Sequence, residues 1–239
     1  MKKYHIAYHL VDHCNLNCAG CNHFSPLAKE RYASLELFER NIKQLVKLID
    51  VPILNLMGGE PLLHPQIVDF IKIARKYISN KIYIWTNGIL LKSMGDDFWN
   101  AVNEYNISIR ETNYGIIENK FFNTDRRIYN YHWLSTIRDN KLNICPFFES
   151  YSSVPLLLGE NGLLYMCCVS ANIHHYNNYY GTDIELIKNK DYFNIYDYEK
   201  GSFLLVLKKI RRPFCDYCRA PVMDKWEQFN ESKNLWISK

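Results

Sequence analysis

Three cysteines lie within eight positions near the N-terminus of the chain. The stretch DHCNLNCAGCNHFSPLA, residues 12–28, contains Cys14, Cys18 and Cys21. A structural zinc site usually takes four ligands in a tetrahedron, often as CxxC pairs, and a disulfide framework needs an even number of cysteines. An iron–sulfur cluster can be held by three thiolates, which leaves one iron open for another ligand. The spacing alone leaves these alternatives open, so the surrounding elements have to decide between them.

The composition is that of a soluble globular protein. Of the 239 residues, 48% are hydrophobic and 23% are charged, and the net charge is +4. The densest basic group, at 208–212, is short, so no nucleic-acid partner is expected. The N-terminus is too short and polar for a signal peptide, and no apolar run approaches the ~20 residues of a membrane helix. We therefore expect a cytoplasmic protein without a membrane partner, where cysteines serve as metal ligands or redox groups because structural disulfides are rare.

Strands and helices are predicted to alternate at short spacing over the first half of the chain. The patterns indicate strands at 4–11, 53–60, 81–88 and 107–114, and helices at 34–50, 65–79 and about 90–103. Ser34 is placed to cap the first helix. This order predicts right-handed βαβ units on a parallel sheet. Glycine and polar residues follow the strands, at the carboxyl ends where α/β folds build their sites.

The pattern changes beyond about residue 140. A strand hairpin is predicted within 144–168, with its turn at Glu160-Asn161-Gly162. A loop over 176–181 and a helix near 198–210 follow. We therefore expect a core over residues 1–140, a small domain over 141–222, and a tail or peripheral helix over 223–239.

The cysteine loop and a later glycine turn together resemble the radical SAM enzymes. Cys14-Asn-Leu-Asn-Cys18-Ala-Gly-Cys21 fits the CxxxCxxC signature of that family, at the end of a first strand where the family carries it. The turn after the second predicted strand, Gly58-Gly59-Glu60, resembles the family's GGE motif. The resemblance implies an α/β fold with a partial (β/α)6 barrel. It also implies that the three cysteines hold a [4Fe-4S] cluster whose open iron binds S-adenosylmethionine, and that the GGE residues contact the ammonium group of that molecule.

The resemblance implies an activity and further contacts with S-adenosylmethionine. In the family, one electron from the cluster cleaves S-adenosylmethionine, and the 5′-deoxyadenosyl radical abstracts a hydrogen atom from the substrate. Asn87 and Arg110, at the ends of the third and fourth predicted strands, are candidates to meet the ribose and the carboxylate. Many members have an aromatic residue just before the third cysteine, where this chain has Gly20. His23 and Phe24 are therefore the candidates to pack against the adenine.

The other five cysteines follow a second pattern. Their order is Cys145, then a GxxxxC segment that ends at Cys167, then Cys168, then a CxxC formed by Cys215 and Cys218. This order resembles the auxiliary-cluster module called the Twitch domain, a shortened SPASM domain. The resemblance implies a small hairpin-plus-helix domain in which Cys145, Cys167, Cys215 and Cys218 hold a second [4Fe-4S] cluster that moves electrons or stabilises the fold. The alternative is structural zinc, which the CxxC spacing alone favours.

Cys168 is left over from that ligand set. It alternates with Cys167 along the predicted strand and should point the opposite way. One interpretation is a buried small hydrophobic residue, as free cysteine usually is. The others are a replacement for Cys167 as ligand, or a catalytic hydrogen-atom donor to a substrate radical, as in some radical SAM epimerases.

The leading functional hypothesis is oxidation or epimerisation at a C–H bond of a sugar-like or other small polyhydroxyl metabolite. The chain is expected to begin directly with the first barrel strand, without a peptide-binding domain, which favours a small-molecule substrate. Its size and cluster layout are similar to those of a short Twitch enzyme that dehydrogenates an amino-cyclitol alcohol. The alternatives are a maturase or epimerase of a ribosomally made peptide, and a non-catalytic iron–sulfur electron carrier. A flavodoxin or ferredoxin is the expected reductant.

Overall fold

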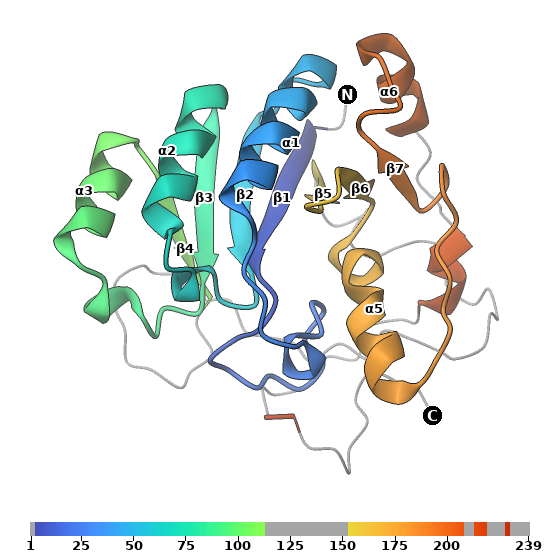
Figure 1. Ribbon diagram of the computed structural model, residues 1–239, viewed down its shortest axis with the longest axis horizontal. Helices are drawn as coiled ribbons and strands as arrows, with labels where there is room; N and C mark the ends of the chain where they lie inside the picture. The colour runs from blue at the N-terminus through green and yellow to red at the C-terminus, as the bar shows by residue number, and fades with distance from the viewer. Residues whose placement is uncertain (1–2, 113–152, 208–212, 219–227, 230–239) are drawn as a thin grey trace.

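A computed structural model describes residues 3–112, 153–207, 213–218 and 228–229, in which one sheet runs in the order β4-β3-β2-β1-β5-β6-β7 (Figure 1). Its strands are β1 (Lys3–Val11), β2 (Ile53–Gly58), β3 (Lys81–Thr86), β4 (Ser108–Glu111), β5 (Ser153–Leu158), β6 (Leu163–Tyr165) and β7 (Tyr192–Asn194). The α-helices are α1 (Leu35–Leu48), α2 (Ile67–Tyr77), α3 (Asp96–Glu104), α5 (Cys168–Tyr180) and α6 (Lys200–Leu207). Short 3-10 helices are formed by Ser25–Leu27, Pro61–Leu63, Leu91–Ser93 and Pro213–Tyr217. None of the helices in these ranges is long and apolar enough to cross a membrane.

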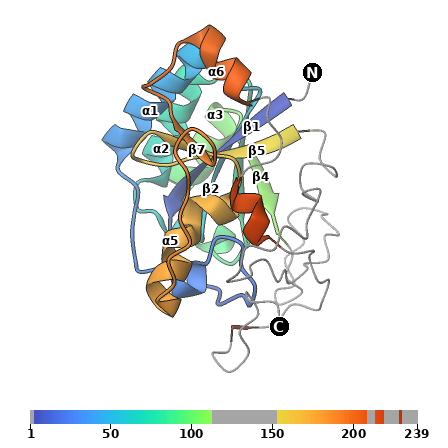
Figure 2. The same ribbon diagram turned by 90° about the vertical axis from the view of Figure 1, so that its right-hand side faces the viewer.

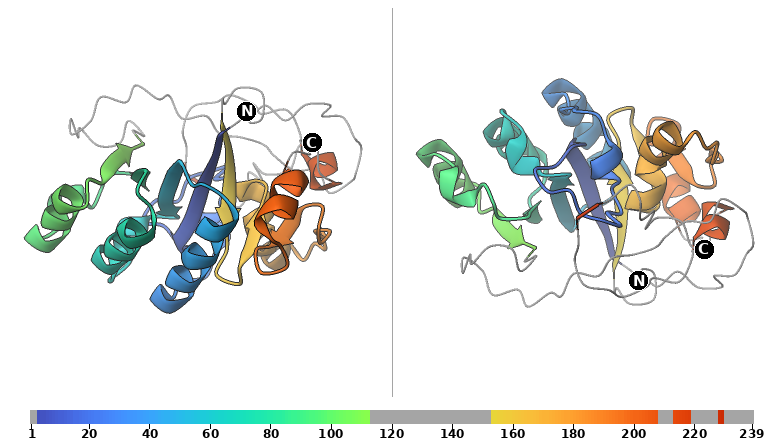
Figure 3. Two further views of the ribbon diagram at one scale, coloured as in Figure 1. Left: turned by 90° about the horizontal axis from the view of Figure 1, so that it is seen from above. Right: turned by 90° about the horizontal axis from the view of Figure 1, so that it is seen from below.

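Strands β1 to β4 run parallel, as the alternation of strands and helices predicts. β1 pairs with β2, β2 with β3, and β3 with β4. The connecting helices α1, α2 and α3 lie side by side on one face of the sheet (Figure 3). In this arrangement the carboxyl ends of all four strands meet at one edge, which is where the cysteine loop and the glycine turn leave the sheet.

The first helix shows how the sequence pattern produces this layer. The Ser34 hydroxyl accepts a hydrogen bond from the Leu37 amide at 3.2 Å, so the predicted cap is confirmed. Phe38 is fully buried, and its ring packs edge-on against Tyr8 of β1, with the ring centroids 4.7 Å apart. Each large apolar side chain buried in this way contributes about 1.5–3 kcal/mol. The core between helices and sheet includes Ile6, Tyr8, Leu10, Phe38, Ile42, Leu45, Leu54, Leu56, Ile82 and Ile84.

The described residues of the second half join the same sheet. β5 lies parallel to β1, with Leu156 opposite Ile6, and β6 and β7 continue the sheet in antiparallel fashion. The predicted hairpin turn is confirmed, since Gly162 has a φ of 76° between β5 and β6. A β-carbon there would also lie 2.7 Å from the ring of Tyr196, so the turn requires glycine. The predicted boundary at residue 140 lies outside the described residues and stays a prediction.

The segment after the hairpin differs from the sequence prediction. A strand is predicted through residue 168 and a loop over 176–181, but β6 ends at Tyr165 and helix α5 begins at Cys168. Cys167 is the N-cap residue of this helix, and its sulfur accepts a hydrogen bond from the Ser170 amide at 3.4 Å. The predicted alternation of Cys167 and Cys168 across a strand is therefore wrong. The apolar positions of α5 do follow helical spacing: Val169, Ile173 and Tyr176.

Candidate functional site

The cysteine loop leaves the carboxyl end of β1 and packs directly on the glycine turn that follows β2. The Gly59 amide donates a hydrogen bond to the carbonyl of Val11 at 2.7 Å, and the Glu60 amide donates to the carbonyl of His13 at 3.2 Å. A β-carbon at Gly58 would lie 2.3 Å from the Val11 oxygen, and one at Gly59 would lie 2.0 Å from the His13 oxygen. Both approaches therefore need glycine. The two sequence motifs form one backbone unit.

The Glu60 side chain is fully buried and ties this unit to the end of β3. Its carboxylate accepts hydrogen bonds from the Leu62 amide at 3.0 Å, the Thr86 hydroxyl at 2.8 Å and the Asn87 amide at 2.8 Å. Burial raises the pKa of Glu60, and these donors offset part of that increase. Because both carboxylate oxygens are engaged by the protein, Glu60 acts here as a brace. A contact between Glu60 and a bound ammonium group stays a prediction.

Asn87 connects the end of β3 to the first cysteine of the loop. Its side-chain nitrogen donates to Asn15 Oδ1 at 2.7 Å and lies 3.6 Å from Cys14 Sγ. Its side-chain oxygen accepts a hydrogen bond from the Ile89 amide at 3.0 Å, which fixes the orientation of the amide group. Asn87 therefore lies beside the cysteine loop, and its predicted contact with the ribose or the carboxylate of S-adenosylmethionine stays a prediction.

Cys14, Cys18 and Cys21 are reduced cysteines of intermediate exposure. The pKa of Cys14 is raised to about 12, chiefly by burial and in smaller part by the nearby Glu60, Cys21 and Cys18. Thiols that oppose one another's ionisation in this way become thiolates when they coordinate a metal centre, which supplies the compensating positive charge. Three close cysteines on one loop are the donor set of a cluster with one open iron, so the residues present fit a [4Fe-4S] group.

After the third cysteine the loop packs against α5. Phe24 has a left-handed backbone (φ 54°) and is fully buried, with its ring centroid 5.6 Å from that of Tyr176. His23 lies 2.5 Å from His9 between ring nitrogens, and burial lowers the pKa of His23 to about 4. The predicted packing of Phe24 or His23 on an adenine stays a prediction, and for Phe24 it would require this cluster to open. The apolar cluster around Phe24 also contains Cys21, Cys167, Cys168, Val169, Ile173, Tyr176, Phe214 and Cys218.

Three of the four predicted auxiliary ligands lie in the described part of the chain. Cys167 caps α5, and Cys215 and Cys218 lie at the 3-10 helix Pro213–Tyr217, which is drawn in red in Figure 2. The Cys218 amide donates a hydrogen bond to the Cys215 carbonyl at 3.1 Å. Cys167 and Cys218 pack on the same apolar cluster, so the helix cap and the CxxC segment approach each other. Cys145 lies outside the described residues. The full ligand set and its metal therefore stay predictions.

Cys168 occupies the first position of α5 and faces the sheet. It packs with Ala7 of β1, Met57 of β2 and Ala171 of its own helix. Burial raises the pKa of the Cys168 thiol, and Cys167 and Cys21 nearby raise it further. The site thus holds a fourth cysteine beside the loop that carries Cys21.

A buried polar cluster beside the cysteine loop was not predicted from the sequence. The Asp12 carboxylate accepts hydrogen bonds from Arg31 Nε at 2.5 Å and Nη2 at 2.8 Å, and Arg31 also pairs with Glu160 of the β5–β6 turn. Burial opposes ionisation of Asp12, but His175, whose Nε2 lies 3.5 Å from Asp12 Oδ2, and the hydrogen bonds from Arg31 hold its pKa well below the usual range. Ligand atoms of Asp12, His174 and His175 lie within 4.8 Å of one another. Because the guanidinium already engages both carboxylate oxygens, this cluster is an ion-pair network and not a metal site.

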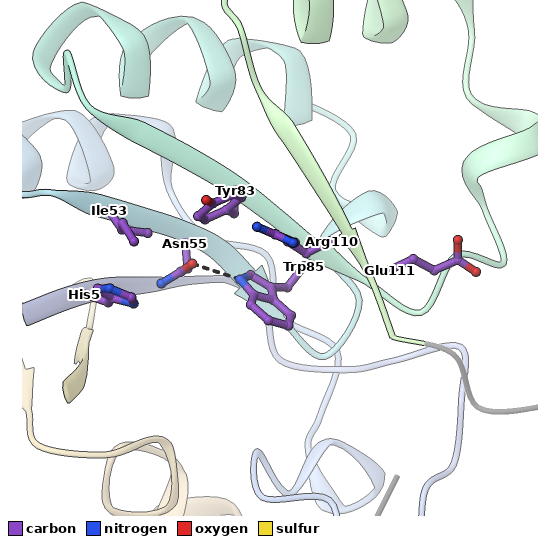
Figure 4. A pocket seen from close by; sticks show the side chains of 7 residues that line it. All are labelled: His5, Ile53, Asn55, Tyr83, Trp85, Arg110 and Glu111. Carbon is purple, nitrogen blue, oxygen red and sulfur yellow. Dashed lines mark hydrogen bonds between the residues drawn. The ribbon is translucent and has the colours of Figure 1, made fainter. Parts of the chain in front are cut away.

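A cavity of about 320 Å³ opens on the face of the sheet opposite α1, α2 and α3 (Figure 4). Its lining residues are His5, Ile53, Asn55, Tyr83, Trp85, Arg110 and Glu111, and all of them except Glu111 alternate along the strands with side chains of the core. The Arg110 guanidinium lies over the ring of Tyr83, 4.6 Å from its centroid. Arg110 thus extends along the sheet into the cavity, whereas Asn87 reaches beyond the strand end to Cys14. The sequence predicts a cofactor contact for Arg110, which stays a prediction, but does not single out Trp85 or Asn55. The signal for Trp85 is the alternation of Lys81, Tyr83 and Trp85 with apolar residues along β3.

Comparisons with known proteins agree with this geometry. The sequence model of the Radical SAM superfamily matches residues 8–141, which is more than half of the chain. A GTP 3′,8-cyclase from Microcystis aeruginosa is 35% identical over 107 residues, which span 42% of this chain and 32% of the relative. A probable GTP 3′,8-cyclase from Pyrococcus abyssi is 32% identical over 101 residues, with the same shares of 42% and 32%. The match thus spans about a third of the length of these relatives.

One comparison concerns a solved structure. SuiB from Streptococcus suis bound to S-adenosylmethionine is 20% identical, and the match covers 42% of this chain and 22% of that chain with a TM-score of 0.35. At this identity and score the likeness adds nothing to the family match. The assignment therefore rests on the superfamily match and on the two motifs that the fold brings together.

Proposed function

Because the chain belongs to the radical SAM superfamily, we propose that it cleaves S-adenosylmethionine reductively and abstracts a hydrogen atom from a substrate C–H bond. The observation that carries the proposal is the backbone unit in which the Gly58–Glu60 turn packs on the start of the cysteine loop. Cys14, Cys18 and Cys21 would hold a [4Fe-4S] cluster, and the glycine turn would lie beside the methionine part of the cofactor. When bound, cluster and cofactor supply the 5′-deoxyadenosyl radical that performs the abstraction.

The residues of the chain would position and shield this chemistry. Glu60 holds the end of β3 against the glycine turn, and Asn87 places its amide beside Cys14. The Asp12–Arg31 pair fixes the segment that leads into the loop. The apolar cluster around Phe24 covers Cys21 and limits the access of water, which protects a reactive radical from side reactions.

The proposed substrate is a sugar-like or other small polyhydroxyl metabolite, which the enzyme oxidises or epimerises. The cavity of about 320 Å³ is at the small end of the range of about 300–1,000 Å³ for small-molecule sites, and it lies on the strands that carry the motifs. The relatives are named for GTP, which is itself a small molecule that contains a sugar. In an oxidation, loss of a hydrogen atom beside an alcohol leaves a ketyl-type radical, which then loses one electron and one proton. The auxiliary cluster proposed at Cys145, Cys167, Cys215 and Cys218 would accept that electron, and a flavodoxin or ferredoxin would supply the first one.

The activity can be tested without the substrate. Anaerobically reconstituted protein that is reduced with dithionite is expected to form 5′-deoxyadenosine from S-adenosylmethionine, measured by liquid chromatography. The controls omit either the protein or the dithionite. A reconstituted, reduced protein that neither binds nor cleaves S-adenosylmethionine would contradict the proposal and would favour an iron–sulfur electron carrier.

Cys168 is proposed as the hydrogen-atom donor if the reaction is an epimerisation. It faces the sheet beside Ala7 and Met57, close to Cys21, and no residue of the predicted ligand sets occupies that position. Donation of its S–H hydrogen would quench the substrate radical, and the sulfur radical left behind would then take one electron and one proton from the reductant. Cys168→Ala is expected to abolish epimerised product while iron content and S-adenosylmethionine cleavage persist. Unchanged turnover in this variant would contradict the proposal that Cys168 donates the hydrogen atom.

A further inference from the structure

The cavity on the face of the sheet opposite α1, α2 and α3 is lined by one arginine in a constrained position. The Arg110 guanidinium lies 4.6 Å from the centroid of the Tyr83 ring, which supports its flat face. Stacking in this way leaves the N–H groups at the edge of the guanidinium for hydrogen bonds. Within the described ranges, no carboxylate forms an ion pair with Arg110. An arginine so placed at a cavity is suited to receive an anion.

Glu111 and His5 also line the cavity, and neither is placed to neutralise the charge of Arg110. Successive residues of a strand point to opposite faces, so Glu111 leaves β4 on the other side from Arg110. Its carboxylate lies against Gly88, where a β-carbon would be 2.6 Å from Glu111 Oε1, and it points away from Arg110 in Figure 4. Burial lowers the pKa of His5, so that side chain is uncharged at neutral pH. Among the described residues that line the cavity, the charge placed to meet a ligand is therefore the guanidinium.

The same cavity offers a fixed aromatic plane. Trp85 Nε1 donates a hydrogen bond to Asn55 Oδ1 at 2.8 Å, and Asn55 Nδ2 donates to the Ile6 carbonyl at 3.3 Å (Figure 4). This chain of hydrogen bonds anchors the indole to the backbone of β1. An indole held in one orientation presents a flat apolar surface that matches the C–H face of a sugar ring, while polar groups at the rim set the orientation of the ligand.

We infer that the substrate is a sugar-like metabolite that carries a phosphate or carboxylate group, which Arg110 binds while Trp85 packs against the ring. This inference rests on the proposed function and adds its substrate class. A guanidinium donates parallel hydrogen bonds that match either anion, and charge-assisted bonds are roughly twice as strong as neutral ones. The assignment gives Arg110 a role toward the substrate, in place of the cofactor contact predicted from the sequence.

Three probes with the same ring test the inference: glucose, glucuronate and glucose 6-phosphate. Each is titrated calorimetrically into the anaerobically reconstituted protein. At least one of the charged probes is expected to bind tenfold or more tightly than glucose. The affinities for glucuronate and for glucose 6-phosphate are then compared, which distinguishes a carboxylate site from a phosphate site. Arg110→Gln is expected to abolish this preference, and Arg110→Lys, which keeps the charge but not the paired donors, to retain part of it.

The chain offers a matched control. Arg40 also lies over a tyrosine ring, 5.8 Å from the centroid of Tyr196, but outside the cavity, so Arg40→Gln is expected to keep the full preference of the wild type. Circular dichroism spectra that match the wild type show that each variant is folded.

Several outcomes would overturn the inference. One is equal affinity for charged and neutral probes, or a preference for charge that survives Arg110→Gln. Another is the absence of saturable binding of both charged probes up to about 10 mM, well above the range in which substrates usually bind. Arg110→Gln could also bind S-adenosylmethionine more weakly than the wild type does and bind the probes equally well. That result would mean that Arg110 contacts the cofactor and not the substrate. Failure of the wild type to cleave S-adenosylmethionine would instead contradict the proposed function. The probe affinities would still decide whether Arg110 binds an anion.

Discussion

Iron content is expected to fall from about eight to about four atoms per chain when Cys14, Cys18 and Cys21 are all replaced by alanine, and formation of 5′-deoxyadenosine is expected to stop. The triple substitution removes the thiols of the loop that leaves β1 and none of the thiols proposed for the auxiliary cluster. The three of them that lie in the described part of the chain, Cys167, Cys215 and Cys218, are at the cap of α5 and at the 3-10 helix Pro213–Tyr217, on elements that the substitution leaves in place. Iron and sulfide are measured on anaerobically reconstituted protein, together with the dithionite-driven assay.

The matched control for the iron measurement is Cys168→Ala. Cys168 lies beside Cys21 and Cys167 but belongs to neither proposed ligand set, so this variant is expected to keep the iron content of the wild type. Iron that falls in this variant would make Cys168 a ligand and not a hydrogen donor. About four irons with bound zinc in the wild type would mean that the second site is structural, and the second cluster would then have no role in accepting an electron from the substrate.

The parallel part of the fold could be predicted because its signals are local. In α1, a capping serine precedes apolar residues at helical spacing, and Ser34 takes its predicted place. The position of β5 beside β1 could not be predicted, since strand partners far apart in the chain are chosen by the packing of the whole sheet. Helix α5 was missed because His174, His175 and the tyrosines leave it only weakly amphipathic, so its apolar residues do not stand out as a stripe.

The candidate site divides in the same way. The cysteines and the glycine turn follow the ends of their strands, and parallel strands end at one edge of a sheet, so their meeting could be expected from the sequence. The contacts of Asp12 could not, because they join residues that are distant in the chain. Arg31 reaches both Asp12 and Glu160, which is 129 positions away from it. The cavity was missed for the same reason, since Asn55, Trp85 and Arg110 come from three different strands.

Gly59→Ala is expected to lower the free energy of unfolding by about 3 kcal/mol and to reduce both the iron content and the cleavage of S-adenosylmethionine. The new β-carbon would lie 2.0 Å from the His13 oxygen and 2.8 Å from the Asp12 oxygen, and these backbone atoms cannot rotate away as a side chain can. The turn would have to move off the loop, which costs about 1–3 kcal/mol for overpacking. It would also break the hydrogen bonds from the Gly59 and Glu60 amides, each worth about 1 kcal/mol. Urea unfolding measures the loss of stability.

Gly201→Ala is the matched control, because the same β-carbon added there meets no atom within 4 Å. Gly201 lies in α6, where alanine is the better helix former, so this variant is expected to be as stable as the wild type or up to about 1 kcal/mol more stable. Equal urea midpoints and equal iron contents for the two variants would contradict the close packing of the glycine turn on the cysteine loop. Normal stability with reduced S-adenosylmethionine cleavage in Gly59→Ala would mean that the methyl group blocks the cofactor, and not that it displaces the loop. The pair of variants therefore separates the role of Gly59 in building the site from a role in binding at it.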